Sequence, residues 1–210
     1  MINKFLKKLF TIYLNPACEL IFNSNYELLV AVILSAQCTD KRVNAVTKEL
    51  FNYYNTPQKM VELSLSELEE KIYSCGFYHN KAKAILSASI DLINKFNSIV
   101  PCEHEQLLSL RGVGEKTANV VQAVGFNIPR IAVDTHVYRL AKRFGFSNGT
   151  SVGQVQKDLE KIVPVKDWIN FHYAMVLHGR YVCKSQKPLC ENCGLKDECK
   201  YYKININKKG

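Results

Sequence analysis

Apolar residues recur along this chain at steps of three and four, the spacing of one face of an α-helix. From Ala82 through Leu86, Ile90 and Ile93 to Phe96 the steps are four, four, three and three. Strictly alternating apolar and polar runs, which would indicate half-buried strands, are scarce. The pattern therefore predicts an all-α fold.

Start and stop signals divide this pattern into many short helices. Ser24, Ser64 and Ser151 each stand three residues before a Glu or Gln and ahead of an apolar stretch, which is the arrangement of a capping box. Several apolar stretches also end near a glycine, a residue that often terminates helices. These glycines are Gly76, Gly125, Gly145 and Gly179.

Two segments bear on membrane association. The longest apolar run, "LLVAVIL" at 28–34, is far below the roughly 17–25 residues that span a bilayer, so it predicts a buried helix. The N-terminal "MINKFLKKLFTIYL" mixes lysines with apolar residues and lacks a continuous apolar segment with a small-residue cleavage site. It predicts an amphipathic helix in a cytoplasmic protein that does not contact a membrane.

Composition and charge narrow the possible partners. With 210 residues, of which 47% are hydrophobic, the chain can bury one good core or two smaller cores that share an interface. It carries 28 Lys and Arg against 19 Asp and Glu, which gives a formal charge of +9. This excess, with ten Phe and eleven Tyr, is compatible with a polyanionic partner such as nucleic acid.

Four of the eight cysteines crowd into one segment near the C-terminus, with the spacing C-x6-C-x2-C-x5-C. They are Cys183, Cys190, Cys193 and Cys199. Thiols so close together, separated by polar residues, can converge on one metal centre, and thiolate ligands favour zinc or iron–sulfur. Disulfides are the weaker alternative because cytosolic thiols are kept reduced. The spacing alone leaves zinc and iron open.

A glycine-containing turn at "LSLRGVGEKTANVV", residues 108–121, is the second unusual segment. It is not a phosphate-binding P-loop, because Glu115 separates Gly114 from Lys116 and the preceding residues predict a helix rather than a strand. A helix–turn–helix remains, in which the free N–H groups of the second helix can receive a DNA phosphate. A purely structural connection between two helices is the alternative.

Five segments, in this order along the chain, together resemble the endonuclease III family of DNA glycosylases. They are "LSAQCTD" at 34–40, "GFYHNKA" at 76–82, "LRGVGEKTANVV" at 110–121, "VDTHVYRL" at 133–140 and the four-cysteine segment. The combination is specific although no single motif is. The turn departs from the family at Arg111, where proline is usual, and this substitution adds a cation near a bound phosphate.

The resemblance implies a two-domain, all-α helix-hairpin-helix glycosylase fold with the DNA cleft between the domains. A six-helix barrel would cover residues 18–128 and contain the hairpin at about 107–122. Residues 1–17 would join 129–210 in an iron–sulfur cluster domain with its cluster loop at 183–199. In the family four cysteines hold a [4Fe–4S] cluster, and the matching residues are Cys183, Cys190, Cys193 and Cys199.

The implied activity is that of a bifunctional DNA glycosylase and AP lyase of base excision repair. By resemblance Lys116 attacks C1′ of a damaged pyrimidine nucleotide, and a Schiff base then leads to strand cleavage 3′ to the abasic site by β-elimination. The lysine must lose its proton first, which the N-terminal end of its helix and partial burial are expected to favour. Asp134 matches the catalytic carboxylate, although a role as a helix N-cap is the simpler reading of that residue, with Thr135 as another possible cap.

Several further residues match family positions that contact DNA. Gln37 and Phe77 would fill the gap left by the extruded nucleotide, with Phe77 replacing a commoner leucine. Each of the two, taken alone, fits an ordinary core or surface role. The hairpin residues and a histidine complete the expected DNA contacts: Arg111, Gly112, Val113, Gly114 and His136.

Two other functions are compatible with parts of this pattern. An adenine-mismatch glycosylase shares the fold and cluster, but that relative lacks the lysine at position 116 and carries an extra C-terminal domain. A non-enzymatic helix-hairpin-helix DNA-binding module would retain the hairpin without the chemistry. The expectation is a monomeric enzyme that acts on damaged double-stranded DNA at the nucleoid of a bacterial-type cell.

Overall fold

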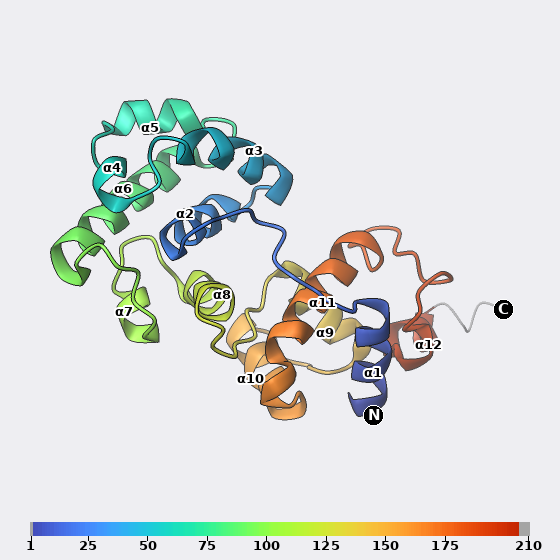
Figure 1. Ribbon diagram of the computed structural model, residues 1–210. Helices are drawn as coiled ribbons and strands as arrows, with labels where there is room; N and C mark the ends of the chain where they lie inside the picture. The colour runs from blue at the N-terminus through green and yellow to red at the C-terminus, as the bar shows by residue number, and fades with distance from the viewer. Residues whose placement is uncertain (1, 206–210) are drawn as a thin grey trace. The chain divides into compact units, whose positions relative to one another are not determined.

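The computed structural model describes residues 2–205, and helices are the only regular secondary structure in that range (Figure 1). The predicted all-α fold is confirmed. The α-helices are α1 (Ile2–Ile12), α2 (Asn25–Ser35), α3 (Asp40–Phe51), α4 (Pro57–Met60), α5 (Leu65–Ile72), α6 (Tyr78–Phe96), α7 (His104–Leu108), α8 (Glu115–Gly125), α9 (Thr135–Phe144), α10 (Val152–Ile162), α11 (Trp168–Tyr181) and α12 (Lys200–Asn205). Two short 3-10 helices complete the set: η1 (Val165–Asp167) precedes α11, and η2 (Lys196–Glu198) precedes α12.

The helices group into two compact units. The second unit is a continuous segment, Glu19–Ile128, which holds α2 to α8. The first unit combines α1 with the described residues from Pro129 onward, so that it contains the first and the last of the described helices. Because the chain leaves the first unit after α1 and re-enters it before α9, residues far apart in sequence form one core there.

The core of the second unit is built around α2. Every side chain from Leu28 to Leu34 is at most 5% exposed, which confirms the buried helix that this apolar run predicts. Helix α2 packs against α3, α6 and α8. Among the described helices none is long and apolar enough to cross a membrane.

The core of the first unit is aromatic. Phe5 of α1 is fully buried, and its ring centroid lies 4.7 Å from the centroids of both Phe144 and Phe146 in edge-on contacts. Leu9, one turn further along α1, is also fully buried, whereas Lys7 on the opposite face is exposed. The predicted amphipathic N-terminal helix is therefore confirmed, and its apolar face covers the C-terminal half of the chain.

The predicted N-caps are confirmed at all three serines. The side chains of Ser24, Ser64 and Ser151 accept the N–H of the residue three positions on. Only Ser64 forms the full reciprocal box, in which Glu67 accepts the Ser64 N–H at 2.8 Å. The other two helices have the serine half of the box.

The predicted helix ends at glycines are partly wrong. Gly145 ends α9 with a left-handed φ of 81°, as expected. Gly179, in contrast, lies inside α11 rather than at its end. A Cβ atom at Gly179 would come within 2.7 Å of the His136 Cβ, so this glycine serves the close packing of α11 against α9.

Replacing Phe5 with alanine is expected to lower the free energy of unfolding by about 3–5 kcal/mol, because it removes a fully buried ring between two other rings. Lys7→Ala on the exposed face of the same helix is the matched control, with an expected change within about 0.5 kcal/mol. Urea unfolding followed by circular dichroism measures both. Equal effects of the two changes would mean that α1 does not contribute to the core.

Candidate functional site

The hairpin between α7 and α8 is held against α6 by a contact that only glycine permits. Gly112 has a φ of 86°, and a Cβ atom placed on it would lie 2.4 Å from the Ala84 Cβ on α6. The neighbouring side chains of Leu110 and Val113 are buried. The turn is therefore anchored on both sides of Gly112 and cannot shift without unpacking.

A histidine bridge fixes the two helices of the hairpin to each other. His104 on α7 lies 3.0 Å from the Gln122 Oε1 through Nδ1 and 3.0 Å from the Glu115 Oε2 through Nε2. Both partners are on α8. This bridge sets the direction of α8 as it leaves the turn.

The N-terminal end of α8 is open for an anion. Gly114 is the N-cap and offers no side-chain cap, and nothing lies within 4 Å of the position its Cβ would take. The first bond inside the helix runs from the Ala118 N–H to the Gly114 carbonyl, at 2.9 Å. The preceding N–H groups of α8 therefore point toward the helix end, where negative charge is favoured.

Two other hairpin residues are engaged within the fold. The N–H of Val113 donates to the Leu110 carbonyl at 3.1 Å, so this group is used inside the turn. The N–H of Arg111 donates to the Asp91 Oδ2 at 3.3 Å, while the Arg111 side chain is exposed. Arg111 thus leaves its guanidinium available at the surface where the family usually has proline.

Lys116 is the second residue of α8 and therefore lies in its first turn, as expected. Its side chain is exposed, so the expectation of partial burial is wrong for this structure. The exposed position leaves the amine accessible beside the positive end of the helix dipole.

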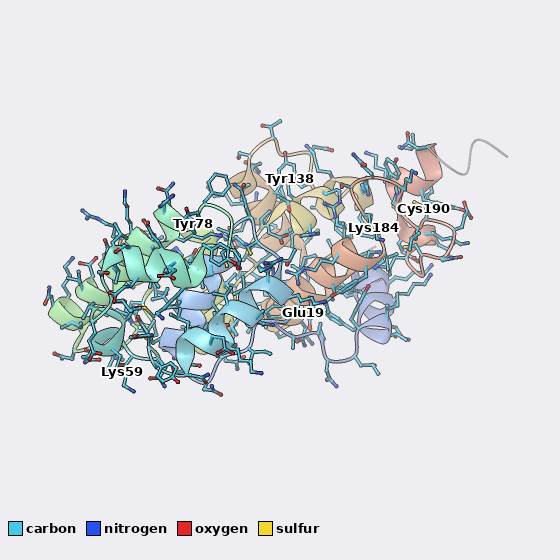
Figure 2. All side chains as sticks on the ribbon, turned by 90° about the horizontal axis from the view of Figure 1, so that it is seen from above. Glu19, Lys59, Tyr78, Tyr138, Lys184 and Cys190 are labelled. Atoms are coloured by element: carbon cyan, nitrogen blue, oxygen red, sulfur yellow. The ribbon has the colours of Figure 1, made fainter. Side chains whose placement is uncertain are left out.

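Gln37 and Phe77 occupy two adjacent turns with unusual backbone geometry. Their φ values are 51° and 58°, in the left-handed region that side chains rarely adopt. The turns touch, because a Cβ atom on Gly76 would lie 3.4 Å from the Gln37 carbonyl oxygen. Phe77 is 64% exposed and immediately precedes Tyr78, which Figure 2 labels at the start of α6.

Asp134 is the N-cap of α9, so the simpler reading of this residue is confirmed, and Thr135 is the first residue inside the helix. Its Oδ1 accepts the N–H groups of His136 and Val137, each at 2.8 Å. Its Oδ2 lies 3.1 Å from the His136 Nδ1. Burial raises the pKa of Asp134, but these hydrogen bonds outweigh it and hold the pKa at about 2. The carboxylate is ionised at neutral pH.

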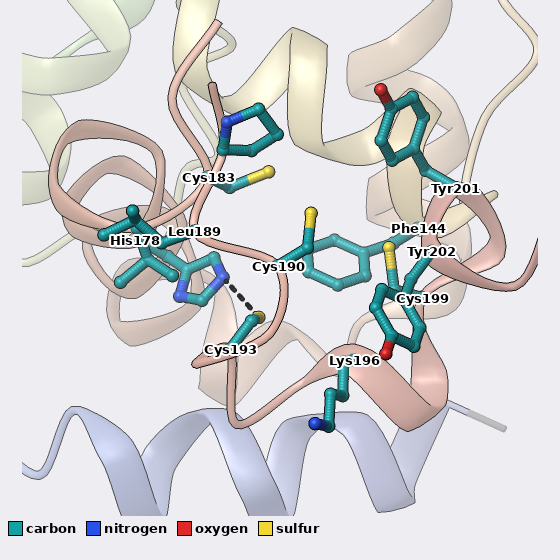
Figure 3. A pocket seen from close by; sticks show the side chains of 12 residues that line it. Phe144, His178, Cys183, Leu189, Cys190, Cys193, Lys196, Cys199, Tyr201 and Tyr202 are labelled. Carbon is teal, nitrogen blue, oxygen red and sulfur yellow. Dashed lines mark hydrogen bonds between the residues drawn. The ribbon is translucent and has the colours of Figure 1, made fainter. Parts of the chain in front are cut away.

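The four clustered cysteines line one pocket (Figure 3). Their thiols surround this pocket together with Phe144, His178 and Tyr201. No set of three His, Cys, Asp or Glu side chains among the described residues is arranged around a single ion. Four soft sulfur donors spread around a volume match a multi-iron cluster, which takes one thiolate at each iron. The residues present therefore fit such a group.

Burial controls the protonation of the groups at this pocket. It raises the pKa of the Cys193 thiol to about 11 and lowers the pKa of His178 to about 4. The neutral His178 ring lies 3.4 Å from the Cys193 Sγ through Nε2 and 3.1 Å from the Tyr13 hydroxyl through Nδ1. Because buried thiols keep their protons without a cation, metal binding here releases protons.

Two arginines that the sequence analysis missed hold the pocket in place. Arg143 donates to the Cys183 Sγ at 3.2 Å and to the Lys184 carbonyl at 2.7 Å. Arg139 donates to the carbonyls of Cys183 and Gly179. Both lie on α9, four residues apart and hence on one face of the helix. The spacing of four between these two arginines, directly after the Asp134 motif, was the sequence signal that could have identified them.

Comparison with known proteins places this geometry in a family. Residues 30–165 match the HhH-GPD superfamily of base excision DNA repair proteins. The endonuclease III of Haemophilus influenzae is 46% identical over 187 residues, which cover 89% of each chain. That of Bacillus subtilis is 45% identical over 196 residues, covering 93% of this chain and 90% of its own.

This chain belongs to the endonuclease III family. Solved structures of the family agree: a non-covalent endonuclease III–DNA complex superposes with a TM-score of 0.94 at 45% identity and covers 98% of this chain and 97% of its own. A trapped covalent endonuclease III–DNA intermediate superposes with a TM-score of 0.93 at 46% identity and covers 96% and 95%. Membership makes this chain a DNA glycosylase with AP lyase activity in base excision repair. The family is generally iron–sulfur containing.

Proposed function

We propose that this enzyme excises oxidised or ring-damaged pyrimidines from double-stranded DNA and cuts the resulting abasic strand through Lys116. The observation that carries the proposal is an accessible lysine in the first turn of α8, directly after an anion-accepting turn. The covalent DNA complex solved for a relative supports a nucleophilic mechanism.

The adjacent turns at Gln37 and Phe77 fill the gap in the duplex. The target nucleotide must leave the base stack before its C1′ can be attacked, and apolar side chains commonly replace an extruded base. Phe77 is 64% exposed, so most of its ring is not used for packing within its own unit, which supports this assignment. Strained, left-handed residues are also concentrated at functional sites.

Lys116 supplies the nucleophile. Its neutral amine attacks C1′, the bond to the base breaks, and the sugar ring opens to leave an imine between the lysine and C1′. Loss of a proton from C2′ then expels the 3′ phosphate and cuts the strand. The Lys116 amine is exposed in the first turn of α8, so it can reach C1′ of an extruded nucleotide.

Asp134 stabilises the positive charge that develops at the sugar and accepts protons. A carboxylate with a pKa of about 2 enters the reaction ionised, which suits the stabilisation of positive charge; being a weak base, it passes a proton on rather than retaining it. Its bond to the His136 Nδ1 also orients that imidazole, whose exposed edge is proposed to contact DNA.

The hairpin grips the phosphate backbone. The open N-terminal end of α8, the small Gly112 and Gly114, and the exposed Arg111 guanidinium together present donors and a cation to one anion. Val113 contributes by packing the turn, since its side chain and N–H face the protein. These phosphate contacts carry no base sequence information, so the hairpin binds all duplexes alike and does not itself select lesions.

The four cysteines at positions 183, 190, 193 and 199 are proposed to hold a [4Fe–4S] cluster. When bound, the cluster cross-links the loop that supplies all four thiolates and sets its charge. The donor hydrogen bond from Arg143 to the Cys183 Sγ and the nearby His178 orient the sulfurs for that role. We further propose that the enzyme acts as a monomer at the nucleoid of a bacterial-type cell.

Lys116→Gln is expected to abolish base excision and strand cutting at an oxidised pyrimidine, by about 10³-fold or more, while sparing DNA affinity. The amide retains the length of the side chain but cannot form an imine. Borohydride added during turnover should join the wild-type protein covalently to DNA and give no adduct with the variant, as read on a denaturing gel.

Asp134→Asn is the comparison variant for this experiment, because asparagine also caps helices and the charge alone is lost. It should slow excision yet still give the borohydride adduct. A glutamine variant at position 116 that forms the adduct at the wild-type rate would exclude Lys116 as the nucleophile. Binding without any cutting by the wild type would favour a non-enzymatic DNA-binding module.

Gly114→Val is expected to weaken binding to damaged and undamaged duplexes alike and to reduce the salt dependence of binding. The Cβ position is open, so the free energy of unfolding should fall by less than about 1 kcal/mol. Gly112→Val is the matched contrast, with a loss of about 2–5 kcal/mol because of its positive φ and the Ala84 contact. Fluorescence anisotropy at several salt concentrations and urea unfolding measure the two effects. A change of lesion preference alone would refute the hairpin assignment.

Cys193→Ala is expected to remove the visible absorption of thiolate-to-iron charge transfer and to lower the midpoint of thermal unfolding, because metal binding and folding are coupled. Cys102→Ser, at an exposed cysteine of the second unit, is the control and should alter neither. Protein made anaerobically with ample iron that is colourless and holds stoichiometric zinc would overturn the iron assignment.

A further inference from the structure

A second pair of cysteines lies behind the two turns that carry Gln37 and Phe77. Cys38 directly follows Gln37, and Cys75 stands two residues before Phe77. The turns touch at the Gln37 carbonyl and Gly76, which brings the free thiols of Cys38 and Cys75 close enough to influence each other's ionisation. Neither cysteine belongs to the cluster pocket or has a part in the proposed lyase chemistry.

The surroundings of this thiol pair are unusual. Cys75 is fully buried, whereas Cys38 is partly exposed and therefore reachable by a small solute. Lys81 on α6 is 5% exposed and donates its Nζ to the Leu34 carbonyl at 2.8 Å, at the C-terminal end of α2. The positive charges of Lys81 and Arg42 act on Cys75, and Lys81 also interacts with Cys38.

The charges and the burial act in opposite directions. Burial and the neighbouring Cys38 raise the pKa of the Cys75 thiol to about 11, while Lys81 and Arg42 favour its thiolate. Burial likewise lowers the pKa of Lys81, and the two cysteines oppose that change. Cys38 is the more accessible thiol and therefore reacts first with a small disulfide. The enclosed Cys75 then attacks the resulting mixed disulfide.

We propose that Cys38 and Cys75 form a reversible disulfide that locks the two DNA-inserting turns together. The oxidant is a low-molecular-weight disulfide such as oxidised glutathione. The Cys38 thiolate attacks it, forms a mixed disulfide and releases one glutathione thiolate. The Cys75 thiolate then attacks the Cys38 sulfur, forms the Cys38–Cys75 bond and releases the second glutathione. The sum consumes two protein thiols and one small disulfide and yields one protein disulfide and two small thiols.

The bond would act on DNA engagement through the backbone. Both Gln37 and Phe77 are held in strained left-handed conformations, and their neighbours would become covalently joined. Insertion into a duplex requires the two turns to adjust around an extruded nucleotide, which the cross-link restricts. The consequence for activity rests on the proposed function, whereas formation of the bond does not.

The full, cluster-loaded protein is treated with oxidised glutathione, and its peptides are mapped by mass spectrometry without reduction. The expected result is a peptide that links Cys38 to Cys75, with a raised midpoint of thermal unfolding and unchanged visible absorption. Excision of an oxidised pyrimidine should slow on the order of tenfold or more and recover on addition of dithiothreitol.

Three variants make the test specific. Cys38→Ser, at a partly exposed position, should excise as fast as the reduced wild type, and oxidised glutathione should no longer slow its excision. Cys75→Ala should instead retain a glutathione adduct on Cys38, because the resolving thiol is missing. Cys102→Ser, at an exposed cysteine of the same unit, should respond as the wild type does.

Each outcome decides the proposal. Absence of the linked peptide, or equal oxidative slowing in Cys38→Ser, would overturn it. A linked peptide without any change in excision would overturn the effect on DNA engagement. If the reduced wild type does not excise at all, the proposed function fails, while the linked peptide and the raised unfolding midpoint still report on the thiol pair.

Discussion

Several groups of the second unit are proposed to contact DNA. The close approach of Gly112 to Ala84 determines their positions. It seats the hairpin on α6, and α6 also carries Phe77 at its start and Lys81 one turn later. Lys81 in turn holds the end of α2 next to Gln37. One helix therefore positions the hairpin, Phe77 and the end of α2 next to Gln37, and an added Cβ at Gly112 would push the hairpin away from this helix.

Helix α9 has the corresponding role in the first unit. Its N-cap is Asp134, and its later turns carry Arg139 and Arg143, which hold the cysteine loop. Gly179 lets α11 approach α9 closely enough for this arrangement. The Asp134 carboxylate and the arginines that hold the cysteine loop are thus carried by one short helix, although the loop itself has little regular structure.

The strained backbone at Gln37 and Phe77 and the thiol pair Cys38 and Cys75 lie in the same two turns. The two turns proposed to enter DNA have left-handed residues at Gln37 and Phe77, and the neighbouring Cys38 and Cys75 lie close to a buried lysine. Such conformations persist only where the surrounding packing imposes them. Here the packing of α2 against α6 imposes them, so the proposed disulfide would join segments directly next to the residues proposed to enter DNA.

The sequence by itself determined the all-α class, the three serine caps, the buried α2 and the amphipathic α1, because each follows from neighbouring residues along one helix. The motif order also pointed to the family and to Lys116 at the start of α8. Tertiary structure alone decided that Gly179 packs inside a helix, that Lys116 is exposed and that Cys38 meets Cys75. Those features depend on which distant segments touch, and no periodicity within a segment records such contacts.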